Sequence, residues 1–373
     1  MKKAFVYKLR PTRTQEAKLA ETLETCRHLY NHAVGDRKEA WETEQRSVHF
    51  AEQSASLPGL KTENPYLPQV HSQVLQDVLH RVDRAFQAFF RRCKTGEKPG
   101  YPRFRGRGWY DSFTFPQWGN GAKLQDGRLV LSKIGSIRLC ADRPLQGRPK
   151  TCSLIRRADG WYACIVCEYE PCPWPETGQS VGIDLGIEAF ATLDNGERIP
   201  NPRLLKRAQR KLKFAQRRLS RRTKGSHRRR KARALLAKAH LRVQRSRLDH
   251  AHKVSHTLLS RFDTVFVEKL NIRGMLKNHP LAQAISDVGW GLFVSVLGSK
   301  AESAGRRVIE VDPRYTSQDC SHCGARVPKK LSERWHSCPF CGFACHRDEN
   351  AARNTRKKGG GTAFGERLAT ASA

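Results

Sequence analysis

The chain has 373 residues, enough for two or three domains with cores of their own. It carries 69 lysines and arginines against 35 aspartates and glutamates, a formal net charge of +34. So large an excess repels itself unless a polyanion is bound, and nucleic acid is the polyanion that this composition favours. No apolar run approaches the roughly 20 residues that span a membrane, and Pro11 and the nearby charges exclude a secretion signal. We therefore expect a cytoplasmic protein without a membrane partner.

The first quarter of the chain predicts one strand followed by helices. Residues 3–9 alternate as a short strand, and helical spacing begins at Thr12. A second amphipathic helix is predicted over His71–Cys93. The apolar face of the first helix comprises Leu19, Leu23, Cys26, Leu29 and Tyr30, and that of the second Val74, Val78, Val82, Phe86 and either Phe89 or Phe90. Residues 54–68, SASLPGLKTENPYLP, predict a loop between the two helices.

The pattern changes to β-structure after Lys98. Short β-like runs follow, separated by turn signals such as Asp126-Gly127 and Asp159-Gly160. We expect a small β-barrel-like domain made of the N-terminal strand and residues 96–171. It contains GYPRFRGRGWY, whose aromatic residues either stack on RNA or single strands or belong to the barrel core. These aromatic residues are Tyr101, Phe104 and Trp109.

The second half of the chain alternates strands and helices, which indicates an α/β domain. An apolar strand carries Asp184, and a second strand with an Asp194-Asn195-Gly196 hairpin turn follows it. A later strand within residues 263–272 carries Glu268, and residues 290–305 predict a helix before one more strand.

Residues 198–248 contain no acidic residue and predict two basic helices that break near Gly225. Arginines without acidic partners one helical turn away make a poor free-standing surface, so we expect them to bind phosphate backbones without reading sequence. The alternative is a solvated helical pair that binds nothing. Representative candidates are Arg217, Arg218, Arg221, Arg222, Arg228, Arg229 and Arg230.

Four of the twelve cysteines form two CxxC pairs, Cys320/Cys323 and Cys338/Cys341, separated by 14 residues. Two such pairs, each followed by glycine, predict one structural zinc ion held by four thiolates. His322, His336 and Cys345 are surplus to this set. A third CxxC, Cys164–Cys167, falls in a predicted strand, where residues three apart point to opposite faces, so we expect it in the core.

Three carboxylates lie on three different predicted elements: Asp184, Glu268 and Asp348. Any one of them alone is more simply explained as a turn or surface residue. Together, on a chain that favours a polyanion, they predict a site with two Mg²⁺ ions that cuts phosphodiesters, because Mg²⁺ prefers carboxylate oxygens.

Four segments together resemble the TnpB (OrfB) family of transposon-associated nucleases, relatives of type V CRISPR effectors. They are GIDLGIEA, VEKLNIRGM, VDPRYTSQDCSHCG and CPFCGFACHRDENAARN, and the N-terminal YKLRPTRTQEAKLAETLETCRHLYNHAV and PGYPRFRG extend the likeness over nearly the whole chain. His346 departs from the family, because many relatives have an acid there.

The resemblance implies a multidomain α+β fold with four parts. These are a wedge-like β-barrel (1–11 and 96–172), a helical recognition insert (12–95), a RuvC-like, RNase H-type nuclease domain (179–315 and 346–373, including the basic helical region 198–248) and a zinc-ribbon insertion (316–345). It assigns catalysis and Mg²⁺ binding to Asp184, Glu268 and Asp348, and zinc binding to the four cysteines. The glycine-rich C-terminal tail is expected to lack order.

The resemblance also implies an RNA-guided endonuclease of the prokaryotic cytoplasm. A monomer would use a guide RNA from the transposon end to cleave double-stranded DNA beside a short transposon-adjacent motif. The insert would read that motif, for which Gln73 and Gln76 have suitable side chains. One alternative is a nuclease-inactive RNA-guided regulator, which loss of an acid would mark. Another is a zinc-ribbon nucleic-acid binder without a guide, which leaves Asp184 and Glu268 unexplained.

Overall fold

The computed structural model describes residues 1–330 and 332–360. The chain divides into two compact units, Met1–Glu170 and a second unit that begins at Pro171, and each has its own hydrophobic core. The C-terminal tail, residues 361–373, lies outside the described residues, as does that end of the predicted nuclease segment.

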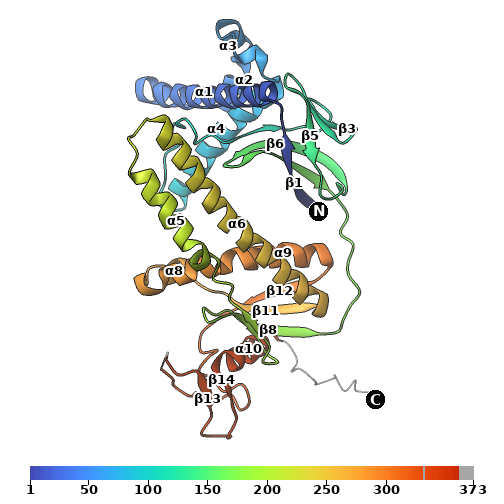
Figure 1. The fold of residues 1–373 in the computed structure, drawn as a ribbon, viewed down its shortest axis with the longest axis vertical. Coiled ribbons are helices and arrows are strands. Elements are labelled where there is room, and N and C mark those ends of the chain that lie inside the picture. Colours follow the sequence, from blue (N-terminus) through green and yellow to red (C-terminus); the bar gives the residue numbers. More distant parts are fainter. Residues whose placement is uncertain (331, 361–373) are drawn as a thin grey trace. The chain divides into compact units, whose positions relative to one another are not determined.

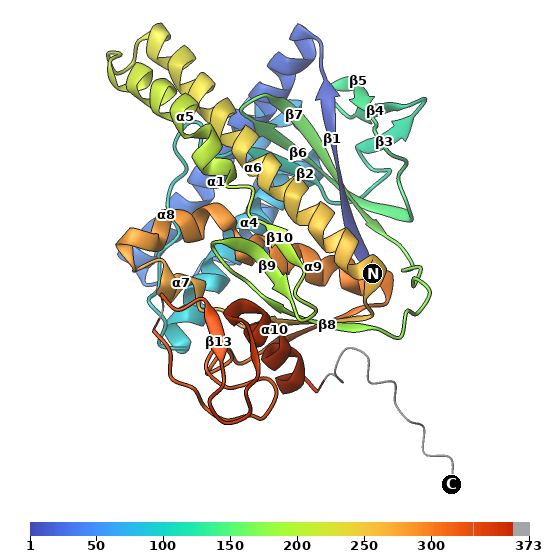
Figure 2. The same cartoon turned by 60° about the horizontal axis from the view of Figure 1, so that its bottom comes forward.

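The first unit contains one antiparallel sheet in the strand order β2-β6-β7-β1-β5-β4-β3. The N-terminal strand lies in the middle, where Val6 pairs with Cys164 of β7 and Leu9 with Leu139 of β5. The sheet curls (Figure 2), but among the described residues its edge strands β2 and β3 do not pair, so it is not a closed barrel. The strands are β1 (Lys2–Arg10), β2 (Ser112–Phe115), β3 (Ala122–Gln125), β4 (Arg128–Leu131), β5 (Gly135–Cys140), β6 (Arg148–Arg157) and β7 (Gly160–Glu168).

Helices occupy most of the chain between β1 and residue 94, and an irregular stretch over residues 95–111 leads to β2. They are α1 (Arg13–Glu44), α2 (Phe50–Ala55), α3 (Leu57–Glu63), the 3-10 turn η1 (Leu67–Gln69) and α4 (Ser72–Lys94). Helix α1 begins with a capping box, in which Thr12 and Gln15 each accept a hydrogen bond from the other's backbone N–H. The prediction of a loop over residues 54–68 is wrong, because Leu57 and Leu67 bury their side chains and Pro58 is compatible with a first helical turn.

The predicted apolar faces of the two long helices are confirmed. Leu19 and Cys26 of α1 and Val74 and Val78 of α4 lie in one buried cluster together with residues of the sheet. At the end of α4, Phe89 is half-buried and Phe90 is 52% exposed, so the face continues to Phe89.

The second unit contains a five-stranded sheet in the order β10-β9-β8-β11-β12. The strands are β8 (Ser180–Asp184), β9 (Ala189–Leu193), β10 (Arg198–Pro200), β11 (Thr264–Glu268) and β12 (Arg307–Val311). Strands β8, β9 and β10 run antiparallel, whereas β11 is parallel to both β8 and β12. Parallel neighbours need long crossover connections, which the helices of this unit supply.

Helices cover both faces of this sheet (Figure 1), with α6 and α9 on one face and α10 on the other. Side chains alternate accordingly along the strands. Val181 and Ile183 of β8 belong to the core with α6 and α9, while Gly182 contacts α10. The helices are α5 (Leu204–Ser220), α6 (His227–Arg261), α7 (Ile272–Met275), α8 (His279–Val288), α9 (Trp290–Ala304) and α10 (Arg347–Lys358).

One stretch of the described chain, His279–Ala304, is long and apolar enough to cross a membrane by length and composition. It consists of two helices, α8 and α9, which meet at Gly289 in the left-handed conformation (φ 72°). Phe293 and Leu297 of α9 are fully buried in the core of the second unit. The stretch therefore consists of helices of 10 and 15 residues, each shorter than the roughly 20 residues that span a membrane.

A small cysteine-rich segment lies between β12 and α10. Its strands β13 (Trp335–Ser337) and β14 (Ala344–His346) pair antiparallel, and Asp319 forms an isolated bridge with Arg326. Helix α10 starts directly after β14, so the segment leads straight into that helix.

Candidate active site and metal centre

Two of the predicted acids lie side by side at the ends of parallel strands. Val267 of β11 pairs with Ile183 of β8, so the next residues, Glu268 and Asp184, occupy equivalent positions. Because side chains alternate along a strand, both acids project from the face opposite the buried Ile183 and Val267. This is the face that α10 covers.

Helix α10 brings the third acid to the same face. A Cβ atom added at Gly182 would lie 2.1 Å from the carbonyl oxygen of Ala352, so the helix touches the strand backbone there. Asp184 lies two residues after Gly182 on the same strand face, and Asp348 lies one helical turn before Ala352 on the same helix face. Glycine at position 182 therefore lets α10 approach β8 closely and places Asp348 over the end of the strand.

His346, the residue that departs from the family, is the N-cap of α10. The Nδ1 atom of this histidine accepts a hydrogen bond from the Asp348 N–H (3.2 Å), which caps the helix. Acidic residues, Asp348 and Glu349, fill the first turn, and basic residues fill the last turn. Both charge placements match the helix macrodipole.

The three carboxylates form one electrostatic cluster. Burial raises the pKa of Asp184 well above its usual range, the negative charges of Glu268 and Asp348 raise it further, and Arg347 opposes them. Burial also raises the pKa of Glu268, although a hydrogen bond from Thr316 opposes the shift. Glu268 and Asp348 are 8% and 9% exposed. Clustered negative charge of this kind favours a bound cation.

Sequence reasoning missed a hydrogen bond to Glu268 and a buried ion pair that joins α10 to the sheet. The Thr316 hydroxyl donates a 2.6 Å hydrogen bond to Oε1 of Glu268, yet a threonine within a loop carries no recognisable signal. Arg356 of α10 donates a 2.7 Å hydrogen bond to Asp194, and both are buried. The same Asp194 carboxylate accepts the Gly182 N–H (3.2 Å). The turn pattern at residues 194–196 was enough to explain an aspartate at position 194, so nothing in the sequence indicated its contact with Arg356.

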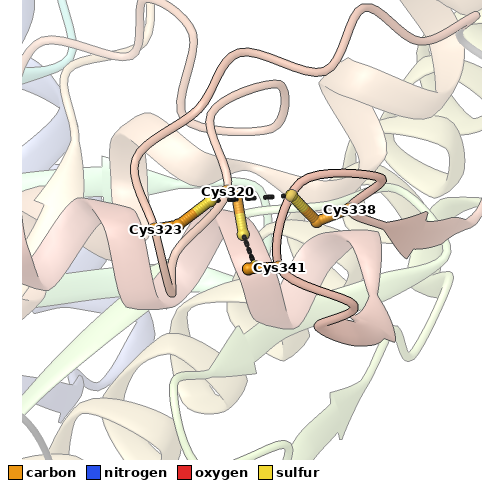
Figure 3. A group of neighbouring side chains, drawn as sticks. All are labelled: Cys320, Cys323, Cys338 and Cys341. Carbon is orange, nitrogen blue, oxygen red and sulfur yellow. Dashed lines mark hydrogen bonds between the residues drawn. The ribbon is translucent and has the colours of Figure 1, made fainter.

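The four cysteines converge as predicted (Figure 3). Their sulfur atoms all lie within 4.8 Å of one another, with Cys320–Cys341 at 3.7 Å and Cys323–Cys338 at 3.6 Å. Zinc–sulfur bonds of about 2.3 Å in a tetrahedron separate sulfurs by roughly 3.8 Å. The donor set therefore fits one zinc ion.

Backbone contacts prepare one of these sulfurs for metal binding. Burial raises the pKa of Cys338, but hydrogen bonds from the backbone N–H groups of Phe340 and Cys341 and from the Cys341 and Cys323 thiols lower it to about 7, while the neighbouring thiols raise the pKa of Cys341. Gly324 and Gly342 adopt positive φ angles (80° and 70°), as tight knuckles after each pair require. Thiolate is the form that binds zinc.

The surplus candidates lie outside this cluster. Cys345 is buried, and His322 stacks against Phe343. In the third CxxC, the two cysteines lie on opposite faces of β7, as expected, but only Cys167 is in the core, whereas Cys164 is half-buried. Among residues 1–330 and 332–360, the four cysteines are the one group of three or more potential ligands that converges on a point. The carboxylates are more widely spread, as a site for two ions 3.5–4 Å apart permits.

The basic segment forms a hairpin of α5 and α6. Five of the candidate arginines are exposed: Arg217, Arg218, Arg221, Arg228 and Arg230. The remaining two, Arg222 and Arg229, are half-buried at the turn, where the Arg229 guanidinium donates to the carbonyl oxygens of Leu219 and Arg222. Arg229 thus holds the hairpin together.

The candidates in the first unit differ in their surroundings. Gln73 donates to the Gln117 side chain (2.6 Å), and Gln76 is exposed on α4. Tyr101, Phe104 and Trp109 are 43%, 57% and 79% exposed, so the alternative that placed them in the core is wrong.

Comparison with known proteins agrees with these features. The family OrfB_IS605, described as a "probable transposase", matches residues 164–279, a Cas12f1-like TNB domain matches residues 290–355, and a helix-turn-helix domain of OrfB_IS605 matches residues 1–46. Among solved structures, a mini-RNA-guided endonuclease, CRISPR-Cas_phi3, has 10% identity and a TM-score of 0.48, covering 96% of this chain and 92% of its own. A likeness that loose supports no statement about this chain.

Two relatives match nearly the full length. A "Putative RNA-guided DNA endonuclease" of Streptomyces pristinaespiralis is 37% identical, over 95% of this chain and 88% of its own. The similarly named InsQ of Escherichia coli K12 is 30% identical, over 94% of this chain and 90% of its own. The chain therefore belongs to the TnpB (OrfB) family of transposon-associated proteins, whose relatives carry the name of RNA-guided DNA endonucleases.

Proposed function

We propose that this protein is an RNA-guided DNA endonuclease that cleaves double-stranded DNA beside a short transposon-adjacent motif. The observation that carries the proposal is the meeting of Asp184, Glu268 and Asp348, from two strands and a helix, on one face of one sheet. A meander of three antiparallel strands followed by two parallel strands supports a RuvC-like, RNase H-type domain.

The three acids would hold two Mg²⁺ ions. All donors are carboxylate oxygens, which Mg²⁺ prefers, and their mutual repulsion raises the pKa of Asp184 even though Arg347 opposes it. When bound, the ions would activate water and stabilise the leaving oxygen of the phosphodiester. Asp184 interacts with both other acids, so it would serve both ions. Glu268, which accepts a hydrogen bond from Thr316, would bind one of the two ions. Asp348, in the first turn of α10, would bind the other.

The basic hairpin of α5 and α6 would bind phosphates of the guide RNA and its target. Its exposed arginines include Arg217, Arg218 and Arg221 on one arm and Arg228 and Arg230 on the other. Such contacts would position the nucleic acid without reading its sequence. Loss of an arginine should therefore weaken binding to all sequences alike and reduce its salt dependence.

The remaining parts would take the roles that the family assigns. Residues 1–11 and 96–172 would form the wedge, and residues 12–95 the recognition insert that reads the adjacent motif, with Gln76 better exposed for this than Gln73. The exposed Tyr101, Phe104 and Trp109 would stack on unpaired bases. Residues 316–345 would be the zinc ribbon, and the protein would act as a monomer on one RNA in the bacterial cytoplasm.

The runner-up, a nuclease-inactive RNA-guided regulator, lacks a supporting observation, because all three acids are present and clustered. Purification from the native locus, RNA sequencing and cleavage of a library with randomised flanks test the proposal. We expect one co-purifying RNA from the transposon end, and Mg²⁺-dependent cuts beside a fixed flanking motif. RNA-dependent binding without any cut would favour the regulator, and absence of a bound RNA would overturn both.

A further inference from the structure

Thr316 links the cysteine knuckle to the carboxylate site. Its side chain is 3% exposed, and its hydroxyl lies 2.6 Å from Oε1 of Glu268 and 3.0 Å from the carbonyl oxygen of Pro313. A hydroxyl donates one proton, and the shorter contact to a charged acceptor takes it. The hydrogen bond fixes one oxygen of Glu268.

The backbone before Thr316 is held in an uncommon conformation. Tyr315 has a φ angle of 61°, in the left-handed region that residues other than glycine rarely adopt. The Arg326 guanidinium lies 3.5 Å from the centre of the Tyr315 ring and donates to Asp319 (3.0 Å), which holds this turn. Strained backbone persists where its surroundings over-determine it, and here it precedes the residue that contacts Glu268.

Two buried asparagines of α10 hold the same turn from the other side. The Asn354 side-chain amide donates to the carbonyl oxygens of Thr316 (2.8 Å) and Asp319 (2.6 Å), and the Asn350 amide donates to Asp319 (2.8 Å). Oδ1 of Asn350 accepts the Ser321 N–H (2.8 Å). Asn354 is 7% exposed and Asn350 is 0% exposed. They therefore clamp both neighbours of Cys320, the first zinc ligand candidate.

We propose that Thr316 is a positioning residue for ion binding: it orients the Glu268 carboxylate, and the zinc knuckle and α10 hold it in place. This inference rests on the proposed function. Groups that orient a metal ligand through a hydrogen bond typically change metal affinity or activity by about 10–100-fold when removed. The same helix carries Asp348, so the knuckle, Glu268 and Asp348 form one connected structure.

Manganese binding by the full-length chain, loaded with zinc and its co-purified RNA, tests this role. Electron paramagnetic resonance of Mn²⁺ gives the affinity, and Asp184→Ala gives the background from RNA. Thr316→Val keeps the shape but loses the hydroxyl, and we expect roughly 10–100-fold weaker Mn²⁺ binding with unchanged zinc content. Thr316→Ser keeps the hydroxyl and should restore affinity to within a few-fold of wild type.

A double-mutant comparison shows whether Thr316 acts through Glu268. Glu268→Gln should weaken Mn²⁺ binding, and adding Thr316→Val to it should cause no further loss. Wild-type Mn²⁺ affinity in Thr316→Val, failure of serine to rescue, or an additive loss in the double variant would each overturn the inference. If wild type and Asp184→Ala bind Mn²⁺ equally, the proposed function itself fails, so the two failures are distinguishable.

Discussion

Replacing Gly182 with alanine tests how α10 is seated on the sheet. An added Cβ would lie 2.1 Å from the carbonyl oxygen of Ala352 and 2.8 Å from Cβ of Arg356. The first obstructing atom belongs to the backbone and the second lies at the root of its side chain, so a rotamer change relieves neither. To reach a separation of 3.0 Å from the carbonyl oxygen, the helix has to move outward by about 0.9 Å.

The cost follows from that displacement. Overpacking costs about 1–3 kcal/mol, and a clash with backbone belongs at the upper end. For a unit of this size each kcal/mol lowers the Tm by roughly 2–4 °C, so we expect a loss of about 6–12 °C. Asp348 lies one turn from Ala352 on α10, and a misplacement of about 1 Å can lower a rate about 100-fold.

Thermal unfolding and guide-directed cleavage, measured together, provide the assay. Gly298→Ala in α9 is the matched control, because a Cβ there meets open space and alanine favours a helix by about 1 kcal/mol. It should keep or raise the Tm and leave cleavage unchanged. If Gly182→Ala matches this control in both measurements, α10 is not seated as described.

Three further predictions concern charge and metal. Asp184→Asn should raise the Tm at pH 8 without divalent ions, because burial, Glu268 and Asp348 raise the Asp184 pKa, so its ionised form destabilises the fold. The gain should vanish below pH ~4, where the unfolded chain also holds the proton, and a gain in Tm at every pH would contradict this. Cys320→Ser should lose zinc and stability, whereas Cys345→Ser should keep about one zinc per chain by elemental analysis; retention of zinc by Cys320→Ser would refute the ligand set. Asp194→Ala should cost about 3–5 kcal/mol in denaturant unfolding, because Arg356 stays buried without its partner, and a loss under about 1 kcal/mol would contradict this.

Local patterns were sufficient for much of the fold. The apolar runs that end in Asp184 and Glu268 identified both strands, and the predicted break near Gly225 lies between α5 and α6. The cysteine spacing predicted a cluster because CxxC geometry is set within a few residues. Helix α3 was missed because its proline and glycine resemble a loop, while burial of Leu57 depends on distant residues.

The contacts between elements were beyond the reach of sequence patterns. Nothing near Gly182 indicates that the Ala352 carbonyl lies against it, and nothing near Thr316 indicates a bond to Glu268. Both contacts join residues that are far apart in the chain. Likewise, nothing in the sequence separates Arg229 from the other basic residues. In the fold, its guanidinium donates a hydrogen bond to the carbonyl oxygen of Leu219.

The central claim is that Asp184 belongs to the centre that cuts DNA under RNA guidance. The most direct test compares the wild-type RNA complex with Asp184→Ala on a DNA target that matches the co-purified RNA, with Mg²⁺ present. We expect the variant to bind the target as tightly as wild type and to leave it uncut, because Asp184 interacts with both other acids. Cleavage by Asp184→Ala at the wild-type rate would contradict the account.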